Sequence, residues 1–78
     1  MKAREMVGRE FKVREEWKIG TCKMKKGDVL RVVDWGLDSV DYYLVFENER
    51  LKGWRFETAL WAFRRRTVPI ERRERWPA

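Results

Sequence analysis

The segment that most restricts the fold runs from Lys25 to Val33, where a polar turn with a glycine opens directly into a strand-forming run. Two further runs rich in β-branched and aromatic residues follow, over Val40–Phe46 and Leu51–Phe56. Short runs of this kind, about ten residues apart with turn residues between them, are typical of a small antiparallel β-barrel or sandwich. The sequence therefore predicts an all-β chain.

Five strands are expected along the chain, each bounded by polar or glycine-containing turns. They are Arg9–Arg14, Val29–Trp35, Val40–Glu47, Leu51–Glu57 and Ala62–Val68. The long polar stretch Glu15–Lys26 is expected to be a folded-over loop. Thr58 is a candidate cap for one 3-10 or helical turn over residues 59–61. Pro69 ends the last strand because it has no backbone N–H. These elements predict a five-stranded antiparallel barrel.

The 78 residues correspond to one domain. We divide it into a charged N-terminal lead-in (residues 1–8) that frays or forms a short helical turn, a barrel (9–68) and a basic C-terminal tail (69–78). A chain of this size buries only about 60–65% of its unfolded surface, so aromatic side chains must supply much of the core. The expected core residues are Phe11, Val13, Leu30, Val32, Val45, Trp54, Phe56 and Leu60.

Composition predicts a cytoplasmic protein. Cys22 is the only cysteine, so no disulfide can form within the chain, which favours a reducing compartment. The N-terminus lacks the apolar segment of a signal peptide, and the longest apolar runs have five residues. The chain has no Gln and one Asn but many Lys, Arg and Glu residues, a pattern typical of thermophiles that predicts a melting midpoint above about 65 °C.

Catalysis is not expected, because the chain has no His to act as a general base and Cys22 has no His partner. The segment from Gly20 to Gly27 lacks the residue order of a phosphate-binding loop. Asp34, Asp38 and Asp41 do not have the spacing of a calcium loop. We therefore expect a binding module without a cofactor or metal.

The net charge of +6 is uneven: residues 1–30 carry +4, residues 31–63 carry −2 and residues 64–78 carry +4. Lys and Arg neutralise phosphates, and exposed aromatic rings stack on bases, so two basic segments around an aromatic-rich barrel favour sequence-tolerant binding of DNA or RNA. The candidate phosphate contacts are Lys25, Lys26, Arg64, Arg65 and Arg66. The candidate stacking rings are Trp17, Trp35 and Tyr42.

A protein-interaction adaptor is the alternative. Arg and Trp concentrate binding energy at protein interfaces, so the segment Arg64–Ile70 and Trp76 can dock on an acidic partner or on a second copy of the chain. A small viral protein that binds a host enzyme would have these features. The sequence allows a monomer or a weak homodimer.

Three motifs resemble a Src-homology-3 domain of the prokaryotic or viral type. They are Lys26-Gly27-Asp28 with Leu30 and Val32 after it, Asp41-Tyr42-Tyr43-Leu44-Val45, and Gly53-Trp54 before Ala59-Leu60. The resemblance covers residues 11–68 and implies an SH3-like barrel. The family's N-terminal Ala-Leu-Tyr-Asp-Tyr motif is absent, and Lys residues replace the acidic residues of its first loop. Proline-rich peptide binding is therefore not implied, although Tyr42 and Trp54 match groove positions near Asp38 and Asp41.

Overall fold

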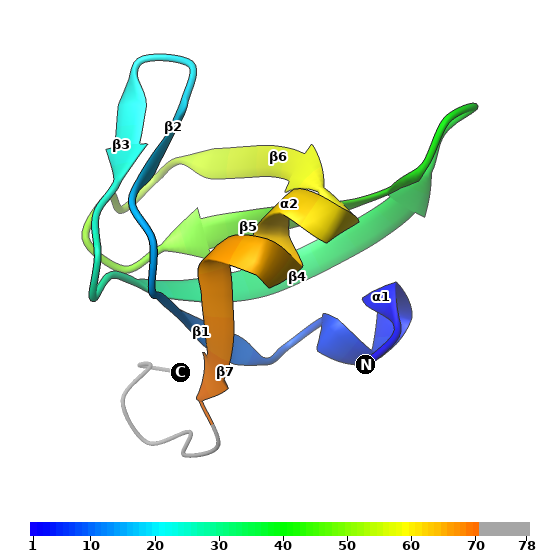
Figure 1. Ribbon diagram of the computed structural model, residues 1–78, viewed down its shortest axis with the longest axis horizontal. Helices are drawn as coiled ribbons and strands as arrows, with labels where there is room; N and C mark the ends of the chain where they lie inside the picture. Colours follow the sequence, from blue (N-terminus) through cyan, green and yellow to red (C-terminus); the bar gives the residue numbers. More distant parts are fainter. Residues whose placement is uncertain (71–78) are drawn as a thin grey trace.

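The structure, a computed structural model, describes residues 1–70 of the chain (Figure 1). It contains seven strands and two short helices among these residues. In chain order they are α1 (Ala3–Met6), β1 (Glu10–Val13), β2 (Trp17–Ile19), β3 (Cys22–Met24), β4 (Val29–Leu37), β5 (Tyr42–Asn48), β6 (Arg55–Ala59), α2 (Leu60–Arg66) and β7 (Thr67–Ile70). The all-β class expected from the sequence is confirmed.

Five strands form one antiparallel sheet in the order β6-β5-β4-β1-β7, and β2 and β3 form a separate hairpin beside it (Figure 1). Within residues 1–70, β6 and β7 are the two edges of the large sheet and do not pair with each other. The sheet is therefore open rather than closed into the expected barrel. Pro69 lies within β7, where an edge strand tolerates its missing N–H.

The core lies between one face of the sheet, the two helices and the β2–β3 hairpin. Phe46 on β5 is fully buried at its centre. Its ring centroid lies 5.7 Å from that of Phe56 and 5.2 Å from that of Phe63, and Phe63 meets Phe11 edge-to-face at 5.1 Å. Aromatic pairs at these separations add to the free energy gained by burial. The core therefore depends on rings from three strands and one helix.

Of the eight expected core residues, the six on β1, β4, β6 and α2 are buried. Val45 and Trp54 are not. Val45 is half-buried because it alternates with the core-facing Leu44 and Phe46 on β5. Trp54 is exposed because residues 51–54 form a turn, so β6 begins later than the strand expected over Leu51–Glu57.

The expected closing strand Ala62–Val68 is wrong over residues 62–66. Residues 60–66 form α2, and strand pairing begins at Thr67. A helix puts Leu60 and Phe63 on one face, and both are buried against the sheet. The Thr67 hydroxyl donates a hydrogen bond of 2.8 Å to the Phe63 carbonyl at the end of the helix. Tertiary packing of this apolar face outweighs the strand pattern of the segment.

The stretch Glu15–Lys26 is also more regular than the expected loop, because it contains β2 and β3. Gly20 lies in the tight turn between them with a φ of 62°, a backbone conformation that glycine adopts without strain. Met24 is fully buried, and Trp17 and Ile19 pack against the core. The hairpin therefore covers one end of the core.

A hydrogen-bond network around Asp28 holds this end together. Its carboxylate accepts hydrogen bonds from the Asn48 side chain at 2.9 Å, the Lys25 amide at 2.9 Å and the Arg50 guanidinium at 3.0 Å. Burial alone would raise the pKa of Asp28. The three donors together outweigh it and hold the pKa below its ordinary value. The network joins the turn before β4 to the turn after β5.

Candidate functional site

A groove of about 630 Å³ lies at the opposite end of the sheet, where α1 and α2 approach the ends of β4 and β5. Three aromatic rings, three cations and one acid line it, together with two aliphatic side chains. The lining residues are Lys2, Ala3, Arg4, Trp35, Asp41, Tyr42, Leu60, Trp61 and Arg64. Its volume lies within the roughly 300–1,000 Å³ of small-molecule and cofactor sites.

The strand register places two of these rings together. A bulge between Val32 and Asp34 shifts the pairing of β4, so that Trp35 lies opposite the buried Leu44. Cross-strand partners share a face of the sheet, so Trp35 lies on the core-facing side. The ring of Trp35 lies 6.0 Å from that of Tyr42, with a tilt of 36°. The core-facing side therefore continues past the core as an aromatic surface.

The three rings of the groove are accessible to a ligand. Trp35 is 38% exposed, Tyr42 43% and Trp61, on the first turn of α2, 57%. Rings that are partly held by the protein and partly open to solvent can stack on a flat ligand without unfolding the core. Base-sized aromatic groups are ligands of this kind.

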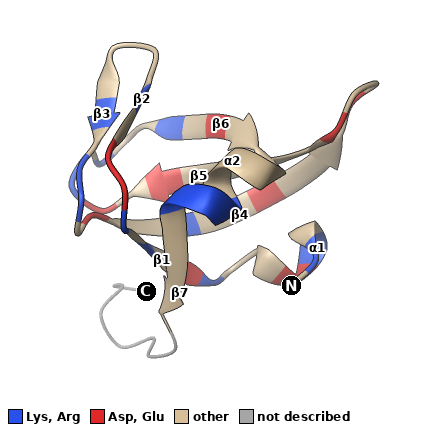
Figure 2. Cartoon of the chain, viewed as in Figure 1, with Lys and Arg blue, Asp and Glu red and all other residues tan. Residues whose placement is uncertain are grey.

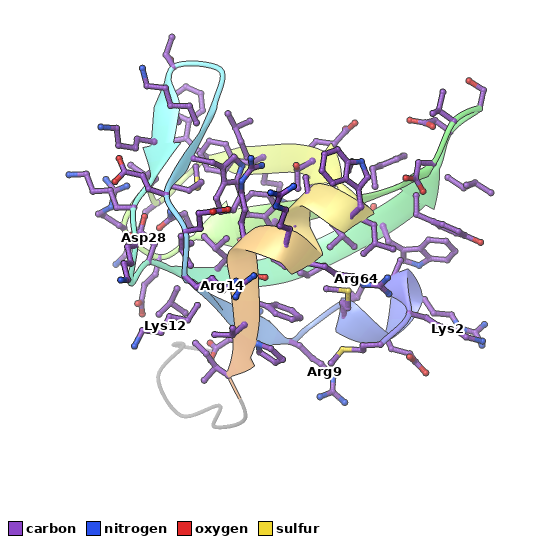
Figure 3. All side chains as sticks on the ribbon, viewed as in Figure 1. Lys2, Arg9, Lys12, Arg14, Asp28 and Arg64 are labelled. Carbon is purple, nitrogen blue, oxygen red and sulfur yellow. The ribbon has the colours of Figure 1, made fainter. Side chains whose placement is uncertain are left out.

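Three cations surround these rings. Lys2 and Arg4 come from the N-terminal segment and Arg64 from the second half of α2, and Figure 3 shows Lys2 and Arg64 at this end of the molecule. Among residues 1–70, none of the three forms an ion pair with an acidic side chain. A guanidinium nitrogen of Arg64 donates a hydrogen bond to the Met1 carbonyl, which ties the N-terminus to α2. Within residues 1–70, Lys2 and Arg4 share only the longer-range field of the Glu5 carboxylate, so the groove keeps positive charge that can attract an anion.

The nearest acid of α1 is already engaged. Glu5 accepts a hydrogen bond of 2.7 Å from the Lys2 backbone N–H. This bond holds the pKa of Glu5 below its ordinary value, so the carboxylate is ionised at neutral pH. Glu5 does not line the groove.

The predicted contact residues do not form one site. The structure brings Trp35, Tyr42 and Arg64 into the groove. Lys25 and Lys26 precede β4 at its other end, and the first residue of that strand, Val29, lies about 20 Å from Trp35 at roughly 3.3 Å per strand residue. Figure 2 shows this separation, with cations on α1 and α2 and a second group around β3.

The other predicted contacts have structural roles. Trp17 packs on the core with its ring centroid 6.4 Å from that of Phe46, and the Arg66 guanidinium lies 5.7 Å above its ring. Arg66 also lies 3.7 Å from Glu15. The Arg65 carbonyl accepts a hydrogen bond from Arg14 at 2.9 Å, and the Arg65 side chain is exposed outside the groove.

Sequence reasoning missed Lys2, Arg4 and Trp61 as site residues. Trp61 lies two residues before the buried Phe63 in a segment that was expected to turn and then extend. Only a helix over residues 60–66 places Trp61 and Arg64 on one side, three residues apart. No local sequence pattern marks Lys2 and Arg4 as site residues, because only the fold brings α1 against β4 and β5.

The outer face of the sheet offers a poor anion site because its charges alternate. Across the strands, Arg55 lies opposite Glu47, Glu47 opposite Arg31, and Arg31 opposite Glu10. Arg55 and Glu47 form an ion pair of 3.2 Å. Glu10 is buried, and neither of its carboxylate oxygens has a hydrogen-bond partner within residues 1–70. The formal charges of this row sum to zero, so the row offers a polyanion little attraction.

In the described part of the chain, no group of three or more acidic or Cys side chains is placed to hold a metal ion. None of its helices has the length and apolar character needed to cross a membrane. The chain matches no protein-family model, and comparisons with curated proteins and solved structures gave no significant match.

Proposed function

We propose that this protein binds single-stranded DNA or RNA in the groove between α1, α2 and the β4–β5 hairpin. One observation carries the proposal: three accessible rings (Trp35, Tyr42, Trp61) and three cations that form no ion pair within residues 1–70 line the same cavity. Proteins that bind single strands combine these two elements, because rings stack on bases and cations neutralise phosphates. A duplex keeps its bases stacked inside and offers the rings no partner.

The proposal includes four expectations from the sequence. The protein acts without catalysis or a cofactor, resides in the cytoplasm and comes from a thermophile. Its open sheet with α2 before the last strand is a variant of the SH3-like arrangement. The motif Gly27-Asp28 supports this last point, because Asp28 anchors the entry to β4 through its hydrogen bonds.

A protein partner is the second candidate, favoured by the tip of the β4–β5 hairpin. Leu37 is 62% exposed and Val40 is 90% exposed there, next to the groove. Exposed apolar side chains beside aromatic rings are features of protein interfaces. An acidic protein surface would then take the place of the nucleic acid.

Fluorescence anisotropy with a labelled single-stranded oligonucleotide tests the proposed function. We expect binding at about 50 mM salt that weakens log-linearly as salt rises, and weaker binding of a duplex of the same length. Trp35→Ala removes a stacking ring and should weaken binding by about 5- to 150-fold. Trp54→Ala is the matched control, because Trp54 is exposed but lies outside the groove.

Two results would contradict the proposal. One is the absence of binding at about 50 mM salt, which would favour the protein-partner candidate. The other is an equal loss of affinity in the Trp35→Ala and Trp54→Ala variants, which would place the nucleic acid elsewhere on the surface.

A further inference from the structure

Asp41 is the one acidic side chain among the residues that line the groove. It is half-buried and directly precedes Tyr42, the first residue of β5. One carboxylate oxygen, Oδ1, accepts a hydrogen bond of 2.7 Å from the Tyr42 N–H. Within residues 1–70, the other oxygen, Oδ2, has no hydrogen-bond or ion-pair partner. The groove therefore holds an unused anionic acceptor.

The hairpin does not need this second oxygen. Its turn is held by Asp38, whose Oδ1 accepts hydrogen bonds of 2.8 Å from the backbone N–H groups of Val40 and Asp41. These bonds hold the pKa of Asp38 below its ordinary value. Asp38 does not line the groove. The turn is thus stabilised outside the site, and Asp41 adds a charge inside it.

A carboxylate in a site for a polyanion repels phosphates, and this weakens binding unless the ligand supplies hydrogen-bond donors to it. The bases of a single strand expose their Watson–Crick edges and can supply such donors. Guanine is the base whose edge presents two adjacent donors, the N1–H and the N2 amino group. Cytosine and adenine each place an acceptor nitrogen beside the amino group, and thymine and uracil flank their N–H with two carbonyls.

We propose that Asp41 makes the groove select guanine among the bases of a single strand. This inference rests on the proposed function. A guanine stacked on the rings of the groove donates its N1–H and N2–H to the Asp41 carboxylate, while Lys2, Arg4 and Arg64 contact the flanking phosphates. A charged acceptor paired with two donors discriminates strongly, because the other bases leave the carboxylate unpaired or opposed by an acceptor.

Binding of a set of labelled five-nucleotide DNA strands tests this inference. The strands carry guanine, adenine, cytosine or thymine at the central position between thymines and are measured at one salt concentration. We expect the guanine strand to bind about 5- to 150-fold more tightly than the thymine strand. Hypoxanthine at the centre lacks the 2-amino group and should lose a large part of the preference.

Two variants of the same hairpin assign the preference to Asp41. Asp41→Asn keeps an oxygen for the Tyr42 N–H but loses the charge, and it should abolish the preference for guanine. Asp38→Asn changes an acid of the same turn that lies outside the groove, and it should leave the preference unchanged. The hypoxanthine strand tests the inference on the unmodified protein, so this test can be made even where a variant fails to fold.

Each result separates the inference from the proposed function. Equal binding of all four strands overturns the inference and leaves single-strand binding intact. A preference that survives in Asp41→Asn overturns it, as does a uniform gain in affinity for all strands in that variant. No binding of any strand, nor of longer single strands at low salt, overturns the proposed function and the inference with it.

Discussion

The core-facing side of the sheet carries aromatic rings at both ends, but the rings are buried at only one of them. At the closed end, the rings of Phe46, Phe56 and the α2 residue Phe63 are buried in the core, which the β2–β3 hairpin covers. At the open end, Trp35 and Tyr42 continue the same face and remain accessible, with Trp61 beside them. The two ends share residue types and differ in what packs over them. Coverage by other elements therefore decides whether a ring stabilises the fold or is available to a ligand.

Two positions on α2 give the largest expected contrast between the two ends. Phe63→Ala removes a fully buried ring that packs on Phe11 and Phe46, and it should lower the free energy of unfolding by about 3–5 kcal/mol. Trp61→Ala trims an exposed ring on the same helix and should cost less than about 1 kcal/mol. Urea denaturation measures both. Equal losses would mean that the open end is part of the core.

The turns at the two ends should also respond differently to loss of an acid. Asp28→Ala leaves the buried Asn48 amide with only the weak acceptor that the Met24 sulfur provides, so we expect a loss of about 2 kcal/mol in the free energy of unfolding. Asp38→Ala, in the exposed hairpin turn, should cost less. The account is contradicted if Asp38→Ala proves the more damaging change in the same denaturation assay.

The pH dependence follows from the lowered pKa of Asp28 in the folded state. Its stabilisation is fully present above the unfolded pKa of about 3.9 and is lost as pH falls through the lower, folded pKa. The unmodified protein should therefore lose stability in this acid range. Asp28→Asn should show a shallower loss there, and an unchanged profile would remove Asp28 from the account.

Within the open end, the two neighbouring arginines of α2 should separate in binding. Arg64 lines the groove and Arg65 does not. Arg64→Gln should weaken single-strand binding by up to about tenfold and reduce the slope of log affinity against log salt by about one. Arg65→Gln should leave that slope close to its original value. Equal slopes for both variants would show that charge acts without regard to position.

The smallest expected effect concerns the outer face near the open end. A Cβ at Gly36 would overlap the ring of Tyr43, its cross-strand partner, so Gly36→Ala should cost about 1 kcal/mol as the ring shifts. The same change in a Tyr43→Ala background should be nearly neutral. Thermal denaturation of the four proteins in this cycle gives the coupling. The absence of coupling would mean that the ring does not constrain Gly36.

The sequence predicts the strands with strong local patterns and fails where tertiary packing decides. The runs at Phe11, Leu30 and Leu44 each lie in an observed strand, because alternation at Phe11 and the dense β-branched or aromatic content at Leu30 and Leu44 are local properties. The segment Ala62–Arg66 reads as a strand and forms a helix, because burial of Leu60 and Phe63 against the sheet determines its conformation. No local sequence pattern indicates that Leu60 and Phe63 pack against the sheet.

The site was predictable in part for the same reason. Trp35, Tyr42 and Arg64 could be chosen by residue type, because rings and cations are what nucleic acids bind. Their meeting in one groove depends on the bulge in β4 and on α2, which the sequence did not reveal. Lys25 and Lys26 were chosen by the same rule and lie at the closed end. Residue type therefore suggests candidate contact residues, and the fold determines which of them lie in the groove.

NMR of the tryptophan indole N–H groups, during titration with a single-stranded oligonucleotide, tests the central claim most directly. Trp35 and Trp61 line the groove, whereas Trp17 packs on the core and Trp54 lies in a turn outside the groove. The account predicts that the Trp35 and Trp61 signals shift in parallel with binding while those of Trp17 and Trp54 stay in place. Shifts centred on Trp54 or Trp17, with Trp35 and Trp61 unmoved, would contradict it.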